Sequence, residues 1–426
     1  MSKPGNRFRG REGMGFVLPD VRETKDTDGE RTARLPERCA VVDLEAIRHN
    51  VRVVRTIAEP ARVMAVVKAD AYGHGAVPVA RAALEAGAAW LGVAHIGEAL
   101  VLRAAGIKAP TLAWLHTSDS DFSAAVGSGI DLGCSGWELG RIADAAREHR
   151  GPARVHLKID TGLGRNGVPP DRWEAVLKEA TGYQEQGLLQ IVGVFSHLAL
   201  ADEPYRTETG VQLDVFRDAV ALAEDAGCDL EVRHIANSAA AFSRPDTHFD
   251  LVRTGLSIYG LSPFTDQSSA DLGLRPAMTL RVLVSHCKRV PAGQGVSYGL
   301  TYRTPGESVL GLIPLGYADG VPRTSNGGPV RVAGTTYRVA GHVAMDQMVV
   351  DLGPDANNAA LAGHEAVLFG TGDGGGPTAD DWAQVAGTIN YEIVSRISPR
   401  VPRIHVNSAS HKPLTGVAAT AAGGQE

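Results

Sequence analysis

One pattern constrains this chain more than any other: an apolar run followed by an Ala/Leu/Glu-rich helical segment recurs between Ala40 and about Leu261. Each run is short and continuously apolar, which is typical of parallel strands buried on both faces. The eight runs span 63–69, 90–94, 111–115, 131–135, 154–160, 191–197, 231–237 and 250–260. Eight such units over roughly 220 residues predict a (β/α)8 barrel, because that fold takes about 250 residues. A doubly wound sheet gives a similar pattern with fewer strands, so the number of runs favours the barrel.

The sequence changes character from about Arg275, where strand-like runs follow one another closely between Gly, Pro and Asn. They cover 280–290, 307–318, 328–344, 348–353 and 365–370, and only 380–398 has helical spacing. The predicted fold class is therefore α/β, with a (β/α)8 TIM barrel at 39–274 followed by a mainly antiparallel β domain at 275–407. Residues 1–38 and 408–426 offer little apolar surface, so we expect a disordered N-terminal extension and a disordered tail.

Charge, hydropathy and cysteine spacing exclude several classes of protein. The formal net charge is −6 and no Lys/Arg-rich cluster reverses it, which gives no electrostatic case for nucleic acid. No apolar stretch reaches transmembrane length, and the N-terminus lacks the apolar segment of a secretory signal. The scattered cysteines Cys39, Cys134, Cys228 and Cys287 form no CxxC pair, as in proteins with reduced thiols. We expect a cytoplasmic protein with no nucleic-acid, membrane or metal partner.

Reactive groups of a barrel enzyme lie at the carboxyl ends of its strands. The expected strand ends carry cationic and polar residues: Lys68, Arg165 after Asp160, His197, Asn237 with Ser238, and Arg253 followed by Gly255. Such a mouth suits an anionic ligand, and barrels tend to hold phosphate at the loops after strands seven and eight. A strand-end lysine beside a phosphate site is what a covalent bond to pyridoxal 5'-phosphate (PLP) requires.

Nine motifs along the chain carry a family resemblance. In order they are AVVKADAYGHGA, HLKIDTGLGRNG, FSHLALADE, HIANSAA, VRTGLSIYG, GVSYGLTY, GYADG, AMDQ and TINYEIVSRI. Together they resemble the alanine racemase family, in order and at compatible separations, from about Val41 to Arg403. The resemblance implies PLP-dependent interconversion of L- and D-alanine, which supplies D-alanine for peptidoglycan. It also implies a homodimer in which each active site draws on both chains.

The resemblance assigns roles to individual residues. Lys68 corresponds to the lysine that holds PLP and acts as one base, and Tyr298 to the opposite base, which reaches into the partner's barrel. The implied cofactor-binding residues are Lys68, Tyr72, His197, Asn237, Ser238, Arg253, Gly255, Leu256 and Tyr391. The implied substrate-binding residues are Arg165, Tyr317, Met345 and Asp346, and Lys158 corresponds to a lysine that is often carbamylated. Racemisation needs a base on each face of the substrate, which agrees with the pairing of Lys68 and Tyr298.

Other functions are weighed against this one. A broad-specificity racemase for serine and other small amino acids would share the same bases. A PLP-dependent decarboxylase has a similar plan, but an acid is expected there opposite the pyridine nitrogen, where Arg253 is expected here. A PLP-binding protein without turnover would be a single barrel. A GxGxxG match at 370–375 lacks the following βαβ unit of a dinucleotide site, so we interpret it as a turn.

Overall fold

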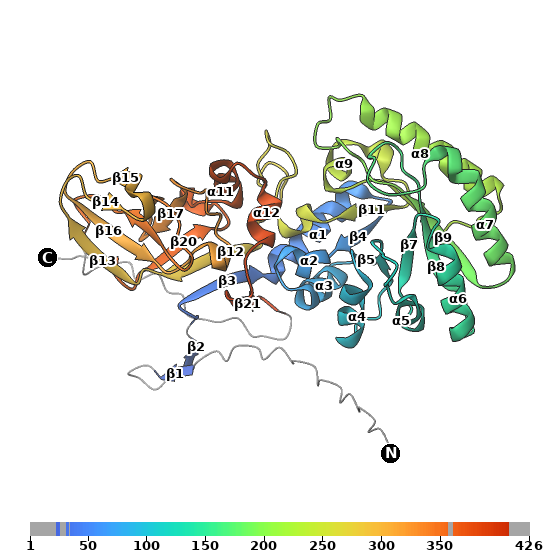
Figure 1. The fold of residues 1–426 in the computed structure, drawn as a ribbon, viewed down its shortest axis with the longest axis horizontal. Coiled ribbons are helices and arrows are strands. Elements are labelled where there is room, and N and C mark those ends of the chain that lie inside the picture. Colours follow the sequence, from blue (N-terminus) through green and yellow to red (C-terminus); the bar gives the residue numbers. More distant parts are fainter. Residues whose placement is uncertain (1–22, 26–30, 34, 357–360, 409–426) are drawn as a thin grey trace, which may run out of the picture.

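The computed structural model describes residues 23–25, 31–33, 35–356 and 361–408. Near the N-terminus, β1 (Glu23–Lys25) pairs antiparallel with β2 (Arg31–Ala33). The remaining residues of the expected extension up to 34, and the expected tail from 409, lie outside the described residues. In the described part of the chain two lobes lie side by side, and the segments that join them run between the lobes (Figure 1).

The first lobe is the expected barrel. Its eight-stranded sheet has the order β10-β9-β8-β7-β6-β5-β4-β11, and neighbouring strands in this order are parallel. The strands are β4 (Arg62–Val66), β5 (Trp90–Val93), β6 (Thr111–Ala113), β7 (Asp131–Cys134), β8 (Ala153–Lys158), β9 (Leu189–Phe195), β10 (Val232–His234) and β11 (Leu251–Thr254). Backbone hydrogen bonds from Asp250 N to Arg233 O (3.2 Å) and from Arg253 N to Ala236 O (3.0 Å) join the two edges. The predicted barrel is confirmed.

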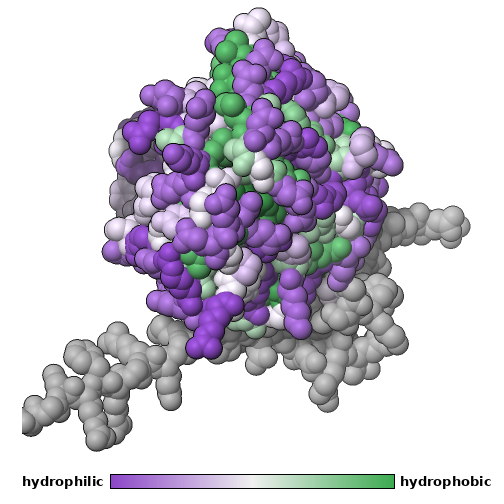
Figure 2. All heavy atoms as spheres, turned by 90° about the vertical axis from the view of Figure 1, so that its right-hand side faces the viewer, coloured by the Kyte–Doolittle hydropathy of each residue, from purple (hydrophilic) through white to green (hydrophobic). Residues whose placement is uncertain are grey.

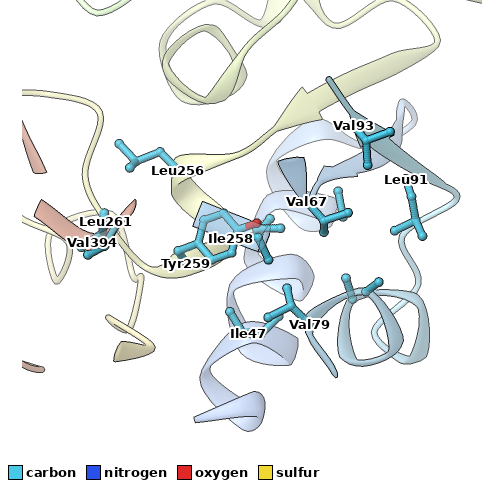
Figure 3. Packing of buried hydrophobic residues seen from close by; sticks show 14 of the residues in the cluster. Ile47, Val67, Val79, Leu91, Val93, Leu256, Ile258, Tyr259, Leu261 and Val394 are labelled. Atoms are coloured by element: carbon cyan, nitrogen blue, oxygen red, sulfur yellow. The ribbon is translucent and has the colours of Figure 1, made fainter. Parts of the chain in front are cut away.

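Helices surround the strands (Figure 1), and many of their apolar residues lie in the hydrophobic core. They are α1 (Leu44–Ala58), α2 (Lys68–Tyr72), α3 (Ala76–Glu85), α4 (Ile96–Ala104), α5 (Phe122–Gly127), α6 (Leu139–His149), α7 (Trp173–Glu185), α8 (Glu208–Asp225) and α9 (Ser238–Ser243). Ile47 of α1 and Val79 of α3 lie in one cluster with strand residues such as Leu91 (Figure 3). A second buried cluster contains Met64 and Trp90 from neighbouring strands. This packing holds the carboxyl ends of the strands in a fixed arrangement.

The second lobe is built on a nine-stranded sheet of order β13-β16-β19-β18-β17-β20-β12-β3-β21. Its strands are β3 (Arg38–Asp43), β12 (Met278–Leu283), β13 (His286–Val290), β16 (Ser308–Ile313), β17 (Pro329–Val332), β18 (Thr335–Val339), β19 (Met348–Asp351), β20 (Glu365–Phe369) and β21 (Arg403–Val406). All its pairs are antiparallel except β21 with β3. The mainly antiparallel domain is confirmed.

The beginning of the barrel differs from the expected boundary. Residues 39–43, expected to open the barrel, form most of β3, which pairs with β12 and β21 in the second lobe. The reason is local: β3 is a short apolar strand followed at once by helix α1, which in sequence looks like one more strand–helix unit. The barrel elements therefore begin with α1, whose N-terminus is capped by the Asp43 side chain.

Several smaller elements complete the second lobe. The expected helical stretch 380–398 contains α11 (Ala379–Ala386) and α12 (Asn390–Ser395), and β14 (Gly295–Val296) pairs with β15 (Tyr302–Arg303). The GxGxxG match forms a turn with the short helix η6 (Asp373–Gly375) after β20, as interpreted from the sequence. Among the described helices, none has both the length and the apolarity to cross a membrane. On the barrel face in Figure 2, polar side chains predominate and apolar ones are scattered.

Candidate active site

A cavity of about 570 Å³ opens at the carboxyl ends of the barrel strands. Most of the residues proposed from the sequence for the barrel side of the site line it: Lys68, Tyr72, Lys158, Arg165, His197, Asn237, Ser238, Arg253, Gly255, Leu256 and Tyr391. Tyr391 comes from α12 of the second lobe, so both lobes contribute to the walls. Four cationic side chains and no carboxylate belong to this lining within the described residues, so the cavity is suited to anions.

Lys68 follows β4 and begins an unusual turn. The four residues 69–72 all have positive φ, between 51° and 54°, and Gly73 continues at 79°. L-amino acids pay roughly 1–2 kcal/mol each for this left-handed conformation, so the turn must be held by its surroundings. The Glu98 carboxylate accepts the N–H of Ala69 at 2.6 Å, and Asp70 accepts the N–H of Ala76 at 2.7 Å.

The charge of Lys68 is adjusted by its neighbours. Burial and the nearby guanidinium groups of Arg165 and Arg253 lower the pKa of the Lys68 ammonium, while Glu98 opposes them. A lysine with a lowered pKa has a larger neutral fraction near pH 7, and only the neutral amine can accept a proton or attack a carbonyl carbon.

A cradle for an oxyanion lies at the carboxyl ends of β10 and β11, next to β4. The Ser238 hydroxyl accepts the backbone N–H of Gly255 at 3.1 Å, and Asn237 caps α9 by accepting the N–H of Ala240 at 3.0 Å. A Cβ atom at Gly255 would lie 2.3 Å from the Tyr72 hydroxyl oxygen, so only glycine permits this approach. The Tyr72 ring packs against Tyr259, with centroids 4.7 Å apart, which fixes the hydroxyl beside the Gly255 backbone.

Arg253 on β11 is anchored inside the barrel mouth. Its guanidinium donates to the backbone oxygens of Ser196 (2.7 Å), His234 (2.8 Å) and Ile235 (3.2 Å). A further contact of 3.3 Å joins it to Nδ1 of His197. Burial lowers the pKa of Arg253 to about 9, and burial with the charge of Arg253 lowers the pKa of His197 well below its usual value. His197 is therefore neutral, which suits it to link Arg253 to another hydrogen-bonding group.

Lys158 ends β8 on the opposite wall. Its ammonium donates to the side-chain oxygen of Asn166 and lies 5.5 Å from the centroid of the Phe195 ring. Burial, and then the charges of Arg253 and Arg165, lower the pKa of Lys158 to about 8. The uncharged share of this lysine near neutral pH is therefore larger than for an ordinary lysine, and formation of a carbamate requires the uncharged amine.

Two family profiles cover most of the chain. The alanine racemase N-terminal domain matches residues 42–263, and the alanine racemase C-terminal domain matches residues 277–405. The chain belongs to the alanine racemase family. The expected resemblance is confirmed, and with it the assignment of this chain as a racemase enzyme.

Named relatives and solved structures agree with the profiles. The chain is 55% identical over 369 residues to the alanine racemase of Beutenbergia cavernae, covering 86% of this chain and 97% of the relative. It is 52% identical over 398 residues to that of Streptomyces coelicolor, covering 92% and 100%. The crystal structure of alanine racemase from D-cycloserine producing Streptomyces lavendulae matches with a TM-score of 0.86 at 54% identity, over 88% of this chain and 98% of that one.

Four residues expected at the site lie apart from the cavity of their own chain. Tyr298, Tyr317 and Met345 are exposed on the second lobe, and the Tyr298 side chain is 71% accessible. Tyr317 N donates to Ala344 O at 3.0 Å, so Tyr317 and Met345 lie on adjoining segments. Asp346 forms an ion pair with Arg400 at 2.7 Å. That these four residues contribute to the active site of a partner subunit stays a prediction.

Several residues at the site were not proposed from the sequence. Trp114, Leu115, Phe195, Asn166 and Ser395 also line the cavity. Trp114 and Leu115 end the expected strand 111–115, so their strand-end position was the available signal. Glu98, which holds the turn after Lys68, begins a helix and gives no such signal.

Proposed function

We propose that this chain is a PLP-dependent alanine racemase that works by a two-base mechanism as a cytoplasmic homodimer and supplies D-alanine for peptidoglycan. One observation carries the proposal: Lys68 shares a cationic cavity with the Ser238–Gly255 cradle. The names of the relatives and the matched structure support alanine as substrate. The four cysteines are free and buried, in keeping with a reducing compartment.

The residues present fit PLP. The Ser238 hydroxyl and the Gly255 and Leu256 backbone would hold its phosphate, with the hydroxyls of Tyr72 and Tyr391 beside them. The cradle leaves no room for a Cβ atom at Gly255, so the backbone is open to close approach by an oxyanion. When bound, PLP supplies an aldehyde for amino groups and a ring that withdraws electrons from the substrate α-carbon.

Two residues would move the α-proton. The neutral Lys68 amine accepts or returns a proton on one face of the substrate, which its lowered pKa favours. Tyr298 of the partner subunit would do the same on the other face through its phenolic oxygen. The strong exposure of Tyr298 in its own chain supports a role across an interface, because a large exposed aromatic side chain is well suited to one.

The remaining cations would position the reactants. Arg165 would bind the substrate carboxylate, and Lys158, once carbamylated, would present a negative charge that orients the Arg165 guanidinium. Arg253 would donate to the pyridine nitrogen, and neutral His197 would connect it to Tyr298 of the partner subunit. With Arg253 and not an acid at this position, the pyridine nitrogen of PLP would stay unprotonated. An unprotonated nitrogen would disfavour decarboxylase and transaminase chemistry.

Chiral analysis of reaction products tests the function. PLP-loaded protein is incubated separately with L-alanine, L-serine, L-lysine and diaminopimelate, and the enantiomers are separated. We expect rapid formation of D-alanine with little product from the others. Comparable turnover of serine would widen the specificity to small amino acids and keep the mechanism. No D-product from any substrate, with PLP still bound, would contradict racemisation.

A further inference from the structure

A chain of polar side chains runs through the barrel interior beneath Arg253. Asp131 on β7, His156 on β8 and His234 on β10 are at most 1% exposed. His156 Nε2 lies 3.5 Å from Asp131 Oδ2, and His156 Nδ1 lies 2.9 Å from His234 Nε2. His234 Nδ1 lies 3.2 Å from Arg253 Nη1. The four side chains therefore connect the amino end of β7 to the guanidinium in the active-site cavity.

The donors along this chain have one direction. A guanidinium can only donate, so His234 Nδ1 is the acceptor toward Arg253 and its proton lies on Nε2. His234 Nε2 then donates to His156 Nδ1, which leaves the His156 proton on Nε2, facing the Asp131 carboxylate. Burial, and then the charge of Arg253, lower the pKa of His234 well below its usual value, so it remains neutral. The order along these side chains is a guanidinium, two imidazoles and a carboxylate.

The interior did not need polar residues to fill its volume. Other positions on the barrel strands hold buried apolar side chains, among them Met64, Leu112 and Val192. Barrel interiors are usually filled with such residues, and burying a charge costs free energy unless it is compensated. A buried carboxylate at this depth therefore indicates an electrostatic role.

Asp131, at the end of this series of side chains that is remote from Arg253, is held by groups near the amino ends of the strands. Asp131 accepts from Arg154 Nε at 2.8 Å and from Trp90 Nε1 at 3.0 Å. Arg154 in turn pairs with Glu231 at 3.0 Å, and the charge of Arg103 also faces Asp131. Burial raises the pKa of Asp131, but the nearby His156, Arg154 and Trp90 outweigh burial and lower it, which keeps the carboxylate ionised.

We propose that Asp131 is a positioning residue for catalysis: through His156 and His234 it acts as the remote counter-ion of Arg253. The inference rests on the proposed function, in which Arg253 faces the pyridine nitrogen of PLP. Asp131 polarises both imidazoles, which makes His234 a stronger acceptor and Arg253 a less acidic donor. Arg253 thus remains a charged donor without giving its proton to the ring. Lys68, Lys158, Arg165 and His197 are the other titratable groups that face Arg253 from the cavity side.

The test compares two substitutions of opposite sign. Asp131→Asn removes a negative charge, and Arg154→Gln removes a positive charge from the same carboxylate. The readout is the midpoint of the pH titration of visible absorbance from PLP bound to Lys68 in the holoenzyme. In Asp131→Asn we expect the midpoint to fall by about half a pH unit. In Arg154→Gln we expect it to rise by less, because the Arg154 side chain is partly exposed to solvent.

A matched control and a cofactor-free measurement keep the inference falsifiable. Trp90→Phe removes a donor to Asp131 without changing charge and should leave the midpoint near the wild-type value. In apoenzyme, nitrogen-15 NMR should show the ring proton of both His156 and His234 on Nε2. Midpoints that move in the same direction in both charge variants, or a proton on Nδ1 of either histidine, would overturn the inference. Wild-type protein that gains no visible absorbance with PLP would instead overturn the proposed function, and this inference with it.

Discussion

The carboxylate of Glu98 accepts the backbone N–H of Ala69 at 2.6 Å, directly after the lysine at the centre of the site. Its other oxygen accepts the N–H groups of Ala94 (2.8 Å) and His95 (3.1 Å). One side chain therefore joins the carboxyl ends of β4 and β5 and holds the first left-handed residue of the turn. The position of Lys68 depends on this bridge, because the turn is unfavourable without it.

Glu98→Ala should loosen the turn and misplace Lys68. A hydrogen bond to a charged group contributes about 1.5–3 kcal/mol, so we expect a loss of roughly tenfold or more in kcat and faster release of PLP on dialysis. The measurements are initial rates and retained visible absorbance. Glu179→Ala on the exposed side of α7 is the control and should match wild type. Normal turnover and PLP retention in Glu98→Ala would show that the turn after Lys68 keeps its conformation without Glu98.

Gly255→Ala should weaken PLP binding through space alone. The added Cβ atom would lie 2.3 Å from the Tyr72 hydroxyl oxygen, while the φ of −102° is negative and does not itself require glycine. We expect at least a tenfold rise in the Kd for PLP, measured by titration of apoenzyme. In the Tyr72→Phe variant the clashing oxygen is absent. Adding Gly255→Ala to that variant should therefore raise the Kd for PLP by a smaller factor than Gly255→Ala does in the wild type. An unchanged Kd in Gly255→Ala would place the phosphate elsewhere.

Tyr298→Phe should reduce turnover in both directions by several orders of magnitude, because a two-base reaction loses its second base. Exchange of the α-proton with solvent from the Lys68 face should persist for one enantiomer. The measurement is racemisation in deuterium oxide, with deuterium incorporation followed separately for L- and D-alanine. Tyr302→Phe, a tyrosine bonded to Asp351 within the second lobe, serves as control. Full activity in Tyr298→Phe would refute the two-base assignment.

Lys158 should make the apoenzyme more stable as the pH rises. Its pKa is lowered from 10.5 to about 8 in the folded chain, so between these values the unfolded chain binds more protons. Lys158 therefore lowers the free energy of unfolding by up to about 3 kcal/mol. This destabilisation is complete below about pH 8 and disappears as the pH approaches 10.5. In buffer free of carbon dioxide, Lys158→Met should raise the Tm near pH 7 and lose this advantage near pH 10. If Lys158→Met raised the Tm equally at pH 7 and at pH 10, the lowered pKa of Lys158 would be contradicted.

Much of the barrel could be predicted because its signal is periodic. Each expected run overlaps one observed strand, since parallel strands buried on both faces must be continuously apolar. The barrel side of the site followed from the strand ends, which the fold brings to one mouth. Lys68, His197 and Arg253 could be placed there without knowing any contact between them.

Other features depend on contacts that no local pattern records. The left-handed turn at 69–72 contains no glycine, so nothing in its composition announces positive φ. The polar chain had a weak signal: His156 and His234 interrupt otherwise apolar strands, but the sequence cannot show that they meet. The positions of β3 and β21 in the second sheet reflect pairing between segments separated by more than three hundred residues.

That last pairing bears on how the molecule is made. β3 lies between β12 and β21, so one of the first strands to leave the ribosome is completed by one of the last. The barrel can form while the second sheet still lacks β21, and β3 must wait, unpaired on that side, until synthesis is almost finished. A chain truncated before Arg403 would leave β3 as a bare edge, open to association with other nascent chains.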